Sequence, residues 1–160
     1  MPHDRSLPIG PFSGPFRFLS NFFPSPVEFD GLTYPTAEHA FQAAKTLDRA
    51  VRERMRQLPT AGAAKRSGRS LALRPDWEQV KLTVMTQILR QKFRHPVLRV
   101  QLLRTHPRPL VEVNAWGDHF WGVCHGHGEN HLGRMLMTLR REFLTEAQPR
   151  STTDTDSAVS

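Results

Sequence analysis

The segment Pro26-Val-Glu-Phe-Asp-Gly-Leu-Thr-Tyr34 is followed without a break by Pro35-Thr-Ala-Glu-His-Ala-Phe-Gln-Ala-Ala-Lys45. Its Asp-Gly pair stands between strand-forming residues, and this combination predicts a β-hairpin that turns at residues 30–31. The second part predicts a helix over about 37–47, with Thr36 as its N-cap. The chain shows no regular alternation of strands and helices, so a hairpin leading straight into a helix favours an α+β fold over a doubly wound sheet.

The rest of the chain is predicted to be mostly helical, with helices over about 49–57, 60–68 and 76–93, after Pro96, and from near Asn130. Two of these helices carry apolar residues at helical spacing, which predicts one buried stripe on each. The stripes consist of Trp77, Val80, Val84 and Ile88, and of Leu132, Met135, Leu136, Leu139 and Phe143. Short strands are expected at 110–113 and 120–123. The expected fold class is therefore α+β: a compact, helix-rich single domain with a small β-sheet.

Length and composition indicate one soluble domain, because 160 residues fit one domain and not comfortably two. We place that domain at residues 12–145, after a flexible arm (1–11) and before a disordered polar tail (146–160). No apolar run approaches the roughly 20 residues that span a bilayer, and no apolar segment typical of a secretory signal follows the N-terminus. The single cysteine, Cys124, suits a reducing compartment. These features predict a cytoplasmic protein that does not bind membranes.

The positive charge of the chain is carried mostly by arginine. The formal net charge is +7, and the basic residues are 18 Arg and 4 Lys. Arginine suits phosphate oxygens, so this excess is typical of a protein with a phosphate-bearing ligand or a nucleic acid. A GC-rich genome would give the same excess, and both interpretations stay open. No block of five or six basic residues indicates a nucleic-acid-binding tail.

The helix expected after Tyr34 carries three polar side chains on one face. At about 100° per residue, Glu38, Gln42 and Lys45 fall within roughly a 60° arc, while Ala40, Ala44 and Leu47 occupy another side. Glu38 could act as an acid or base or bind ribose hydroxyls, and Lys45 could act as a nucleophile or contact phosphate. Spacing alone also allows a Glu–Lys pair on a solvated face.

The segment 112–130 combines two tryptophans, four glycines, Asp118 and a polar run that leads into a helix. Aromatic faces suit a base or sugar, glycines allow close backbone approach, and a helix N-terminus offers N–H groups to phosphate. The segment is therefore either a nucleotide pocket or a loop with core tryptophans. Arg17, Lys65, Arg66 and Arg69 could reach a diphosphate, although each could equally be a solvated charge.

Several other kinds of site are not supported by the sequence. The spacing of the four histidines at 119, 125, 127 and 131 matches none of the standard zinc patterns. Cys124 matches no cysteine-enzyme signature, and a lone cysteine is usually a small buried apolar residue. No G-x-S-x-G motif indicates a serine hydrolase. We therefore predict neither a metal site nor a cysteine or serine nucleophile.

Several motifs, in order and over about residues 12–143, resemble the NADAR family, also described as YbiA-like. They are Phe18-Leu-Ser-Asn-Phe22, Tyr34-Pro-Thr-Ala-Glu-His-Ala-Phe-Gln-Ala-Ala-Lys45, Ala64-Lys-Arg-Ser-Gly-Arg69, Arg74-Pro-Asp-Trp77 with Val80-Lys81 and Val84-Met85, Leu110-Val-Glu-Val-Asn-Ala-Trp-Gly-Asp-His-Phe-Trp-Gly122, Gly128-Glu-Asn-His-Leu-Gly133 and Leu136-Met137. The resemblance implies a helix-rich α+β domain with N-glycosidase activity that needs no metal or organic cofactor.

Two substrate classes are implied by the same resemblance. One is ADP-ribose attached to guanine in nucleotides or nucleic acid, and the other is a phosphoribosyl-amine intermediate of riboflavin biosynthesis. Some relatives carry Asp directly after the Trp-Gly that matches Trp121-Gly122. Here Val123 stands in that place, which favours the ADP-ribose class.

The motifs also imply site residues. Glu38, Lys45 and Asp118 are expected to be catalytic. The residues expected to bind substrate are Arg17, Ser20, Asn21, Phe22, Gln42, Arg66, Arg69, Glu112, Asn114, Trp116, Trp121, Gly122, Gly128 and Asn130. Trp116 or Trp121 would stack on a base, and Arg17, Arg66 or Arg69 would hold phosphates.

Two chemical routes suit these residues. In one, Glu38 or Asp118 activates water or stabilises an oxocarbenium ion. In the other, Lys45 forms an imine with ring-opened ribose while Glu38 moves protons. We favour this second route, which needs a lysine with a lowered pKa. Two hypotheses of other classes remain: a non-catalytic module that binds ADP-ribose or NAD, and a nucleic-acid-binding protein that acts through charge. No stable protein partner is predicted.

Overall fold

The hairpin and the helix after it form as predicted in the computed structural model, in which residues 4–148 are described. Strands β1 (Pro24–Phe29) and β2 (Leu32–Thr36) are antiparallel, and Val27 pairs with Tyr34. Asp30 and Gly31 both have positive φ angles, 47° and 77°, as a two-residue hairpin turn requires. Alternate side chains of both strands are buried, so one face of the hairpin packs on the core.

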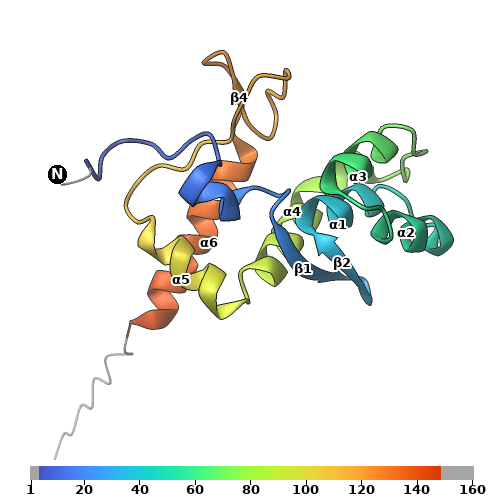
Figure 1. The fold of residues 1–160 in the computed structure, drawn as a ribbon, viewed down its shortest axis with the longest axis horizontal. Coiled ribbons are helices and arrows are strands. Elements are labelled where there is room, and N and C mark those ends of the chain that lie inside the picture. The colour runs from blue at the N-terminus through green and yellow to red at the C-terminus, as the bar shows by residue number, and fades with distance from the viewer. Residues whose placement is uncertain (1–3, 149–160) are drawn as a thin grey trace, which may run out of the picture.

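Helix α1 (Ala37–Ala43) lies at the centre of the domain, and every one of its residues is buried. The hairpin, α2 (Arg49–Arg56), α3 (Ala61–Gly68) and α4 (Trp77–Lys92) all contact it (Figure 1). Three of its seven residues are alanine; at about 100° per residue they share one side of the helix, where small side chains allow neighbours to approach closely. The oxygen of Thr36 accepts from the amide of His39 at 3.1 Å, so the predicted N-cap is confirmed.

The predicted extension of this helix to residue 47 is wrong. The chain turns at residues 44 and 45, where the amides of Lys45 and Thr46 donate to the carbonyls three residues back, and the next carbonyl groups bond outside the helix. Lys45 O accepts from Arg74 N at 2.7 Å, and Thr46 O accepts from Arg52 Nε at 2.8 Å. Leu47 is consequently exposed and does not share an apolar side with Ala40 and Ala44.

Both predicted apolar stripes are confirmed. Trp77, Val84 and Ile88 are buried on α4, while Val80 is partly buried against the same core. The stripe of α6 (His131–Ala147) is also buried, except that Met135 is partly buried. Figure 1 shows α4 between the group around α1 and the group formed by α5 (Pro96–Arg104) and α6. A short 3-10 helix, η1 (Gly14–Leu19), precedes the hairpin.

The second sheet lies later in the sequence than predicted. Strands β3 (Val113–Asn114) and β4 (Val123–Cys124) are parallel and only two residues long, rather than covering 110–113 and 120–123. Leu110 instead forms a bridge with Ile9. The amides of Phe120 and Trp121 bond to a side chain within their own loop, so they are not available to a strand.

At both ends, packed structure extends beyond the expected domain limits at residues 12 and 145. Ile9 is buried, its N–H donates to Pro109 O, and its own carbonyl accepts from Val111 N. Helix α6 runs to Ala147, two residues past the expected limit at 145. Most of the expected polar tail, residues 149–160, lies outside the described residues. Within residues 4–148, no helix is both long and apolar enough to cross a bilayer.

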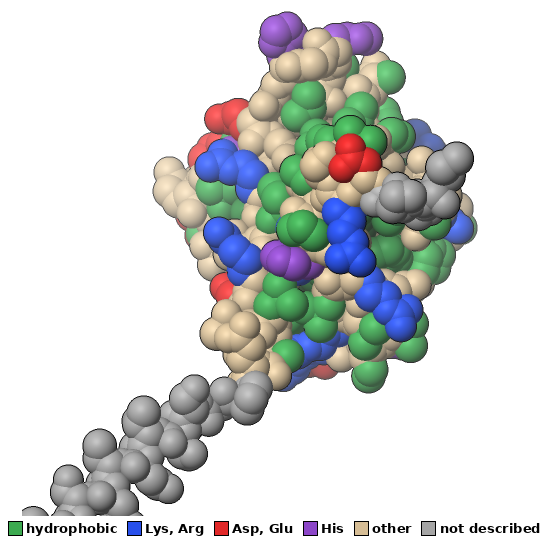
Figure 2. Space-filling model, turned by 90° about the vertical axis from the view of Figure 1, so that its left-hand side faces the viewer, with side chains coloured by type: hydrophobic (Ala, Val, Ile, Leu, Met, Phe, Trp, Pro, Cys, Tyr) green, Lys and Arg blue, Asp and Glu red, His purple; other side chains and the backbone are tan. Residues whose placement is uncertain are grey.

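The arginine excess is spread over the surface and partly buried. On the face shown in Figure 2, Lys and Arg side chains lie among hydrophobic and uncharged ones rather than in one continuous patch. Arg52 is buried, and its Nη1 donates to Asp30 Oδ2 at 2.8 Å. The face shown in Figure 2 therefore carries no broad basic patch of the kind expected for a nucleic-acid interface.

Candidate active site

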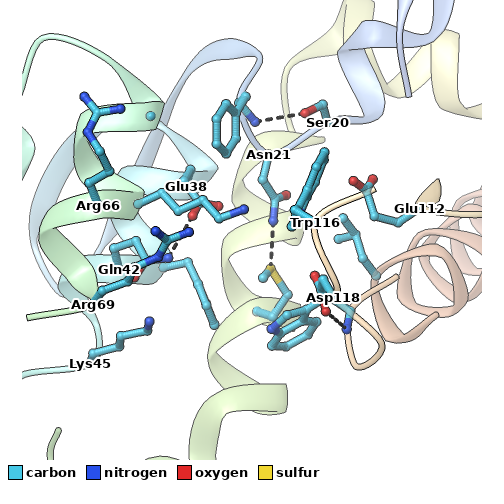
Figure 3. A pocket seen from close by; sticks show the side chains of 17 residues that line it. Ser20, Asn21, Glu38, Gln42, Lys45, Arg66, Arg69, Glu112, Trp116 and Asp118 are labelled. Atoms are coloured by element: carbon cyan, nitrogen blue, oxygen red, sulfur yellow. Dashed lines mark hydrogen bonds between the residues drawn. The ribbon is translucent and has the colours of Figure 1, made fainter. Parts of the chain in front are cut away.

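A cavity of about 530 Å³ lies where α1, α3 and the loop between β3 and β4 meet. Figure 3 shows its polar side chains, which come from both sides of the opening. Its volume lies within the usual range for small-molecule sites. The lining residues are Ser20, Asn21, Phe22, Glu38, Phe41, Gln42, Lys45, Gly62, Lys65, Arg66, Arg69, Met85, Glu112, Trp116, Asp118, Trp121 and Leu132.

Helix α1 supplies a buried carboxylate with few partners. Glu38 is 7% exposed, and its Oε1 accepts from Gln42 Nε2 at 2.8 Å. His39, the next residue, differs because both of its ring nitrogens are bonded, to Thr36 Oγ1 at 2.7 Å and to Leu58 O at 3.0 Å. Buried polar groups are normally satisfied, so His39 has a structural role while Glu38 is left able to bind a ligand.

The charges around the cavity change the pKa values of the Glu38–Lys45 pair. Burial raises the pKa of Glu38, the bond from Gln42 and the charges of Lys65 and Lys45 lower it, and Asp118 raises it further. Burial lowers the pKa of Lys45, against the opposing effect of Glu38, and Arg69 and Lys65 lower it further. The Glu–Lys pair is therefore not on a solvated face, and its amine is closer to neutrality than that of a free lysine.

Helix α3 brings three cations to the same cavity, Lys65, Arg66 and Arg69. Lys65 Nζ lies 4.7 Å from the ring centre of Trp116 and 5.8 Å from that of Phe22. Arg17 behaves differently, because its guanidinium lies over Phe23 and it is not among the described residues that line the cavity. The structure thus brings together two of the three predicted phosphate-binding arginines.

The opposite wall comes from the loop between β3 and β4. Asp118 Oδ1 accepts from the amides of Phe120 at 3.1 Å and Trp121 at 2.9 Å. Asn114 shapes the same loop, since its Nδ2 donates to Asp118 O at 2.8 Å and its Oδ1 accepts from Asp118 N at 3.0 Å. Asp118 lines the cavity, whereas Asn114 supports the loop from behind it.

Three other predicted substrate-binding residues support the backbone instead of lining the cavity. Gly122 lies so close to Glu112 O that a methyl group would collide with it, and Gly128 lies equally close to Gly122 O at a φ of 150°. Asn130 accepts from Glu112 N at 3.0 Å and donates to Leu110 O at 2.9 Å. These residues hold Glu112 and the loop in place.

The two tryptophans have different surroundings. Trp121 packs edge-on against Phe41, with ring centres 5.2 Å apart, and so belongs to the floor of the cavity. Trp116 is 61% exposed at the mouth, so much of its ring is accessible to a ligand. Trp116 is therefore the better placed of the two to stack on a base.

Five lining residues were not among the predicted site residues. Lys65 stands in a segment singled out for its charge, but Phe41, Gly62, Met85 and Leu132 carry no chemical signal in the sequence. Their apolar positions on helices predict only packing. Within residues 4–148, no group of three His, Cys, Asp or Glu side chains is placed so that it could hold a metal ion.

Gly68 gives a test of how Glu38 is positioned. A methyl group on Gly68 would collide with Gln42 Oε1 and lie 2.6 Å from Gln42 Cδ. Because Gln42 donates to Glu38, we expect Gly68→Ala to lower the rate of a reaction that uses Glu38 by about 10²-fold, as misplacements of about 1 Å can. Steady-state kinetics on folded protein would measure this.

Two further variants control this experiment. Gln42→Ala should give a loss of similar size, because the added methyl group acts through Gln42. Gly62→Ala adds a methyl group to the same helix, where it would meet only the ends of side chains, Arg66 Nη1 at 3.4 Å and Thr60 Oγ1 at 3.8 Å, so this variant should melt no lower than the wild type. A Gly68→Ala protein with an unchanged rate would show that Gln42 does not position Glu38.

Comparisons with known proteins agree with this architecture. The family model of the NADAR domain matches residues 8–144. The chain is 47% identical to N-glycosidase YbiA of Escherichia coli over 132 residues, 80% of this chain and 82% of that protein. It is 37% identical to a riboflavin biosynthesis protein of Vibrio vulnificus, over 81% of this chain and 36% of that protein.

A solved structure is also similar. The NMR structure of Escherichia coli YbiA matches with a TM-score of 0.79 and 40% identity, covering 95% of this chain and 94% of that one. The fold class is thus confirmed as α+β, with more helix than strand. The family model covers most of the chain and the YbiA likeness extends over both sequence and structure, so this chain belongs to the NADAR family.

Proposed function

We propose that this N-glycosidase of the NADAR family hydrolyses the N-ribosyl bond between ADP-ribose and guanine. One observation carries the proposal: a buried carboxylate, Glu38, and a half-buried amine, Lys45, line one cavity together with three further cations. Hydrolysis of an N-ribosyl bond needs groups that give a proton to the leaving base and take one from the nucleophile that attacks the anomeric carbon. The surrounding cations suit the phosphates attached to the same ribose.

The polarity of the cavity supports a ligand with an anionic and an aromatic part. Figure 3 shows Lys45, Arg66 and Arg69 on one side, and Glu112, Trp116 and Asp118 on the other. We assign the diphosphate to the cationic side and the base to the side that offers an open indole face and carboxylate acceptors. Guanine carries N–H donors that such acceptors can bind.

Lys45 and Glu38 together suit the imine route. A neutral amine is needed to attack C1′ of the opened ribose, and burial of Lys45 favours the neutral form. Glu38 lies on the preceding turns of the same segment, where it can take and return protons. In the direct route, Glu38 would instead activate water, since one Asp118 oxygen is already engaged by two backbone amides.

A phosphoribosyl-amine of riboflavin biosynthesis is the alternative substrate. The Vibrio vulnificus relative is named for that pathway, and its smaller anion would leave part of the cationic wall unused. The test is to incubate the protein with ADP-ribosyl-guanosine and with the phosphoribosyl-amine, and to follow base release. We expect faster release of the guanine compound. Faster release from the phosphoribosyl-amine would favour the alternative, and tight ADP-ribose binding without release would indicate a non-catalytic module.

Trp116 should contribute to binding more than to chemistry. Base–aromatic stacking is worth about 1–3 kcal/mol, so Trp116→Ala should raise KM about 5- to 100-fold while kcat changes little. Trp116→Phe keeps an aromatic face and should recover most of the affinity. A fall in kcat at unchanged KM would place Trp116 in the chemical step instead.

A further inference from the structure

Glu112 presents an unpaired carboxyl oxygen at the wall opposite α1. Its backbone is fixed, because its amide donates to Asn130 Oδ1 at 3.0 Å and its carbonyl accepts from Val123 N at 2.7 Å. Its Oε2 is buried and has no hydrogen-bond partner among residues 4–148. Figure 3 shows the side chain beside the cavity, on the same wall as Trp116 and across from Arg66 and Arg69.

The charges that face Glu112 come from four different elements. Burial and these charges together raise the pKa of Glu112 to about 7, and burial is the largest cause. Asp118 in the β3–β4 loop and Glu38 on α1 contribute to the rise, while Lys65 on α3 and Lys92 on α4 oppose it. A carboxyl group in this setting keeps its proton in a large part of the molecules near neutral pH.

Glu38 has the opposite kind of neighbours. After burial, its next three influences are the bond from Gln42 and the charges of Lys65 and Lys45, and all three favour the carboxylate. The two carboxyl groups lie on facing walls. Glu38 has cations beside it, whereas the strongest charged neighbour of Glu112 is a carboxylate. This is the arrangement of a base and an acid. Glu112 also lies on the same wall as Trp116, to which the base is assigned, so it is the carboxyl group on the side of the leaving nitrogen.

We propose that Glu112 is the proton donor to the departing base, an assignment that rests on the N-glycosidase function proposed above. The C1′–N bond breaks, its electron pair stays on the base nitrogen, and that nitrogen takes the proton of the Glu112 carboxyl group. In the direct route, the hydroxyl of water bonds to C1′ and its remaining proton goes to Glu38. In the imine route, Lys45 replaces the base at C1′, the departing nitrogen takes the same proton, and water later cleaves the imine. Exchange with solvent restores both carboxyl groups.

Glu112→Gln tests the assignment, because the amide keeps the shape of the side chain but cannot supply a proton. The substrate is whichever of ADP-ribosyl-guanosine and the phosphoribosyl-amine the wild type hydrolyses. The wild-type kcat/KM should fall as pH rises through about 7, since the donor is then ionised. Glu112→Gln should lower kcat about 10²- to 10³-fold and remove this fall. The matched control is Glu129→Gln, at an exposed carboxylate outside the cavity. It should keep the wild-type kcat and the fall in kcat/KM with pH.

A second variant keeps the test valid if Glu112→Gln does not fold. Asp118→Asn retains an oxygen that can accept from Phe120 and Trp121 but removes a charge that raises the pKa of Glu112. The fall in kcat/KM should therefore move to lower pH. The assignment of Glu112 would be wrong if the fall in kcat/KM of Asp118→Asn stays at the wild-type pH, or if kcat of Glu112→Gln is within threefold of the wild type. Neither result would contradict the proposed function. No base release by the wild type from either substrate would overturn the proposed function and the assignment with it.

Discussion

Replacing Lys45 with Met is expected to reduce hydrolysis by about 10³-fold or more, as removal of a covalent nucleophile does. Borohydride added during turnover of ADP-ribosyl-guanosine should link ADP-ribose to the wild-type protein at Lys45 and leave the variant unlabelled. Because burial lowers the pKa of Lys45, the adduct should already form at a pH well below the pKa of an ordinary lysine. Mass spectrometry of the trapped protein would locate the adduct.

Lys45→Arg separates the imine role from a binding role. Arginine keeps the positive charge and can bind phosphate, but its guanidinium cannot form the imine. An inactive Lys45→Arg protein with unchanged ADP-ribose affinity is therefore the expected result. If Lys45→Arg keeps more than a tenth of the wild-type rate and no adduct is trapped, Lys45 only binds the substrate and the direct route holds.

Glu38→Gln is expected to lose hydrolysis about 10²- to 10⁴-fold, because both routes need a carboxylate at this position. The variant should fold correctly, since the amide oxygen can still accept from Gln42 Nε2. Glu28→Gln, at an exposed site on β1, is the control for loss of one negative charge. A Glu38→Gln enzyme with more than a tenth of the wild-type rate would show that another group carries the chemistry.

Glu38→Gln should lower activity but raise the stability of the folded protein. The pKa of Glu38 is raised in the folded state, so its acid form contributes stability that is fully present below the unfolded value near 4.5 and is lost as pH rises through the folded pKa. Each unit of that rise corresponds to about 1.4 kcal/mol. Glu38→Gln should therefore melt at a higher temperature than the wild type at pH 8, and the difference should vanish near pH 4. An equal melting temperature at pH 8 would contradict the raised pKa.

The sequence predicts the boundaries of helices and strands correctly where residues at the boundary itself determine them. The hairpin turn needs only Asp30 and Gly31, and Thr36 caps α1 through a bond within one turn. The end of α1 could not be predicted, because it depends on Arg74, nearly thirty residues later, whose amide bonds to Lys45 O. Tertiary hydrogen bonds of this kind leave no periodic trace in the sequence.

The candidate site was predictable to the extent that it lies on one helix face. Glu38 and Lys45 follow from spacing along a single segment, and the structure places both at the cavity. Lys65 is predictable only as one of the cations that could reach a diphosphate, because spacing alone cannot show which of three basic residues within five positions face a ligand. Arg17 was chosen for its charge, but its place over Phe23 depends on how η1 packs, which the sequence does not show.

The burial of every residue of α1 has a consequence for how this enzyme could acquire new substrates. Glu38 belongs to the packing core, so changes of volume around it alter foldability as well as chemistry. The facing wall is a loop anchored at its ends by β3 and β4, and the tip around Trp116 carries no part of the core. Laboratory evolution toward other nucleobases should therefore accumulate substitutions in residues 115–120 and leave α1 unchanged.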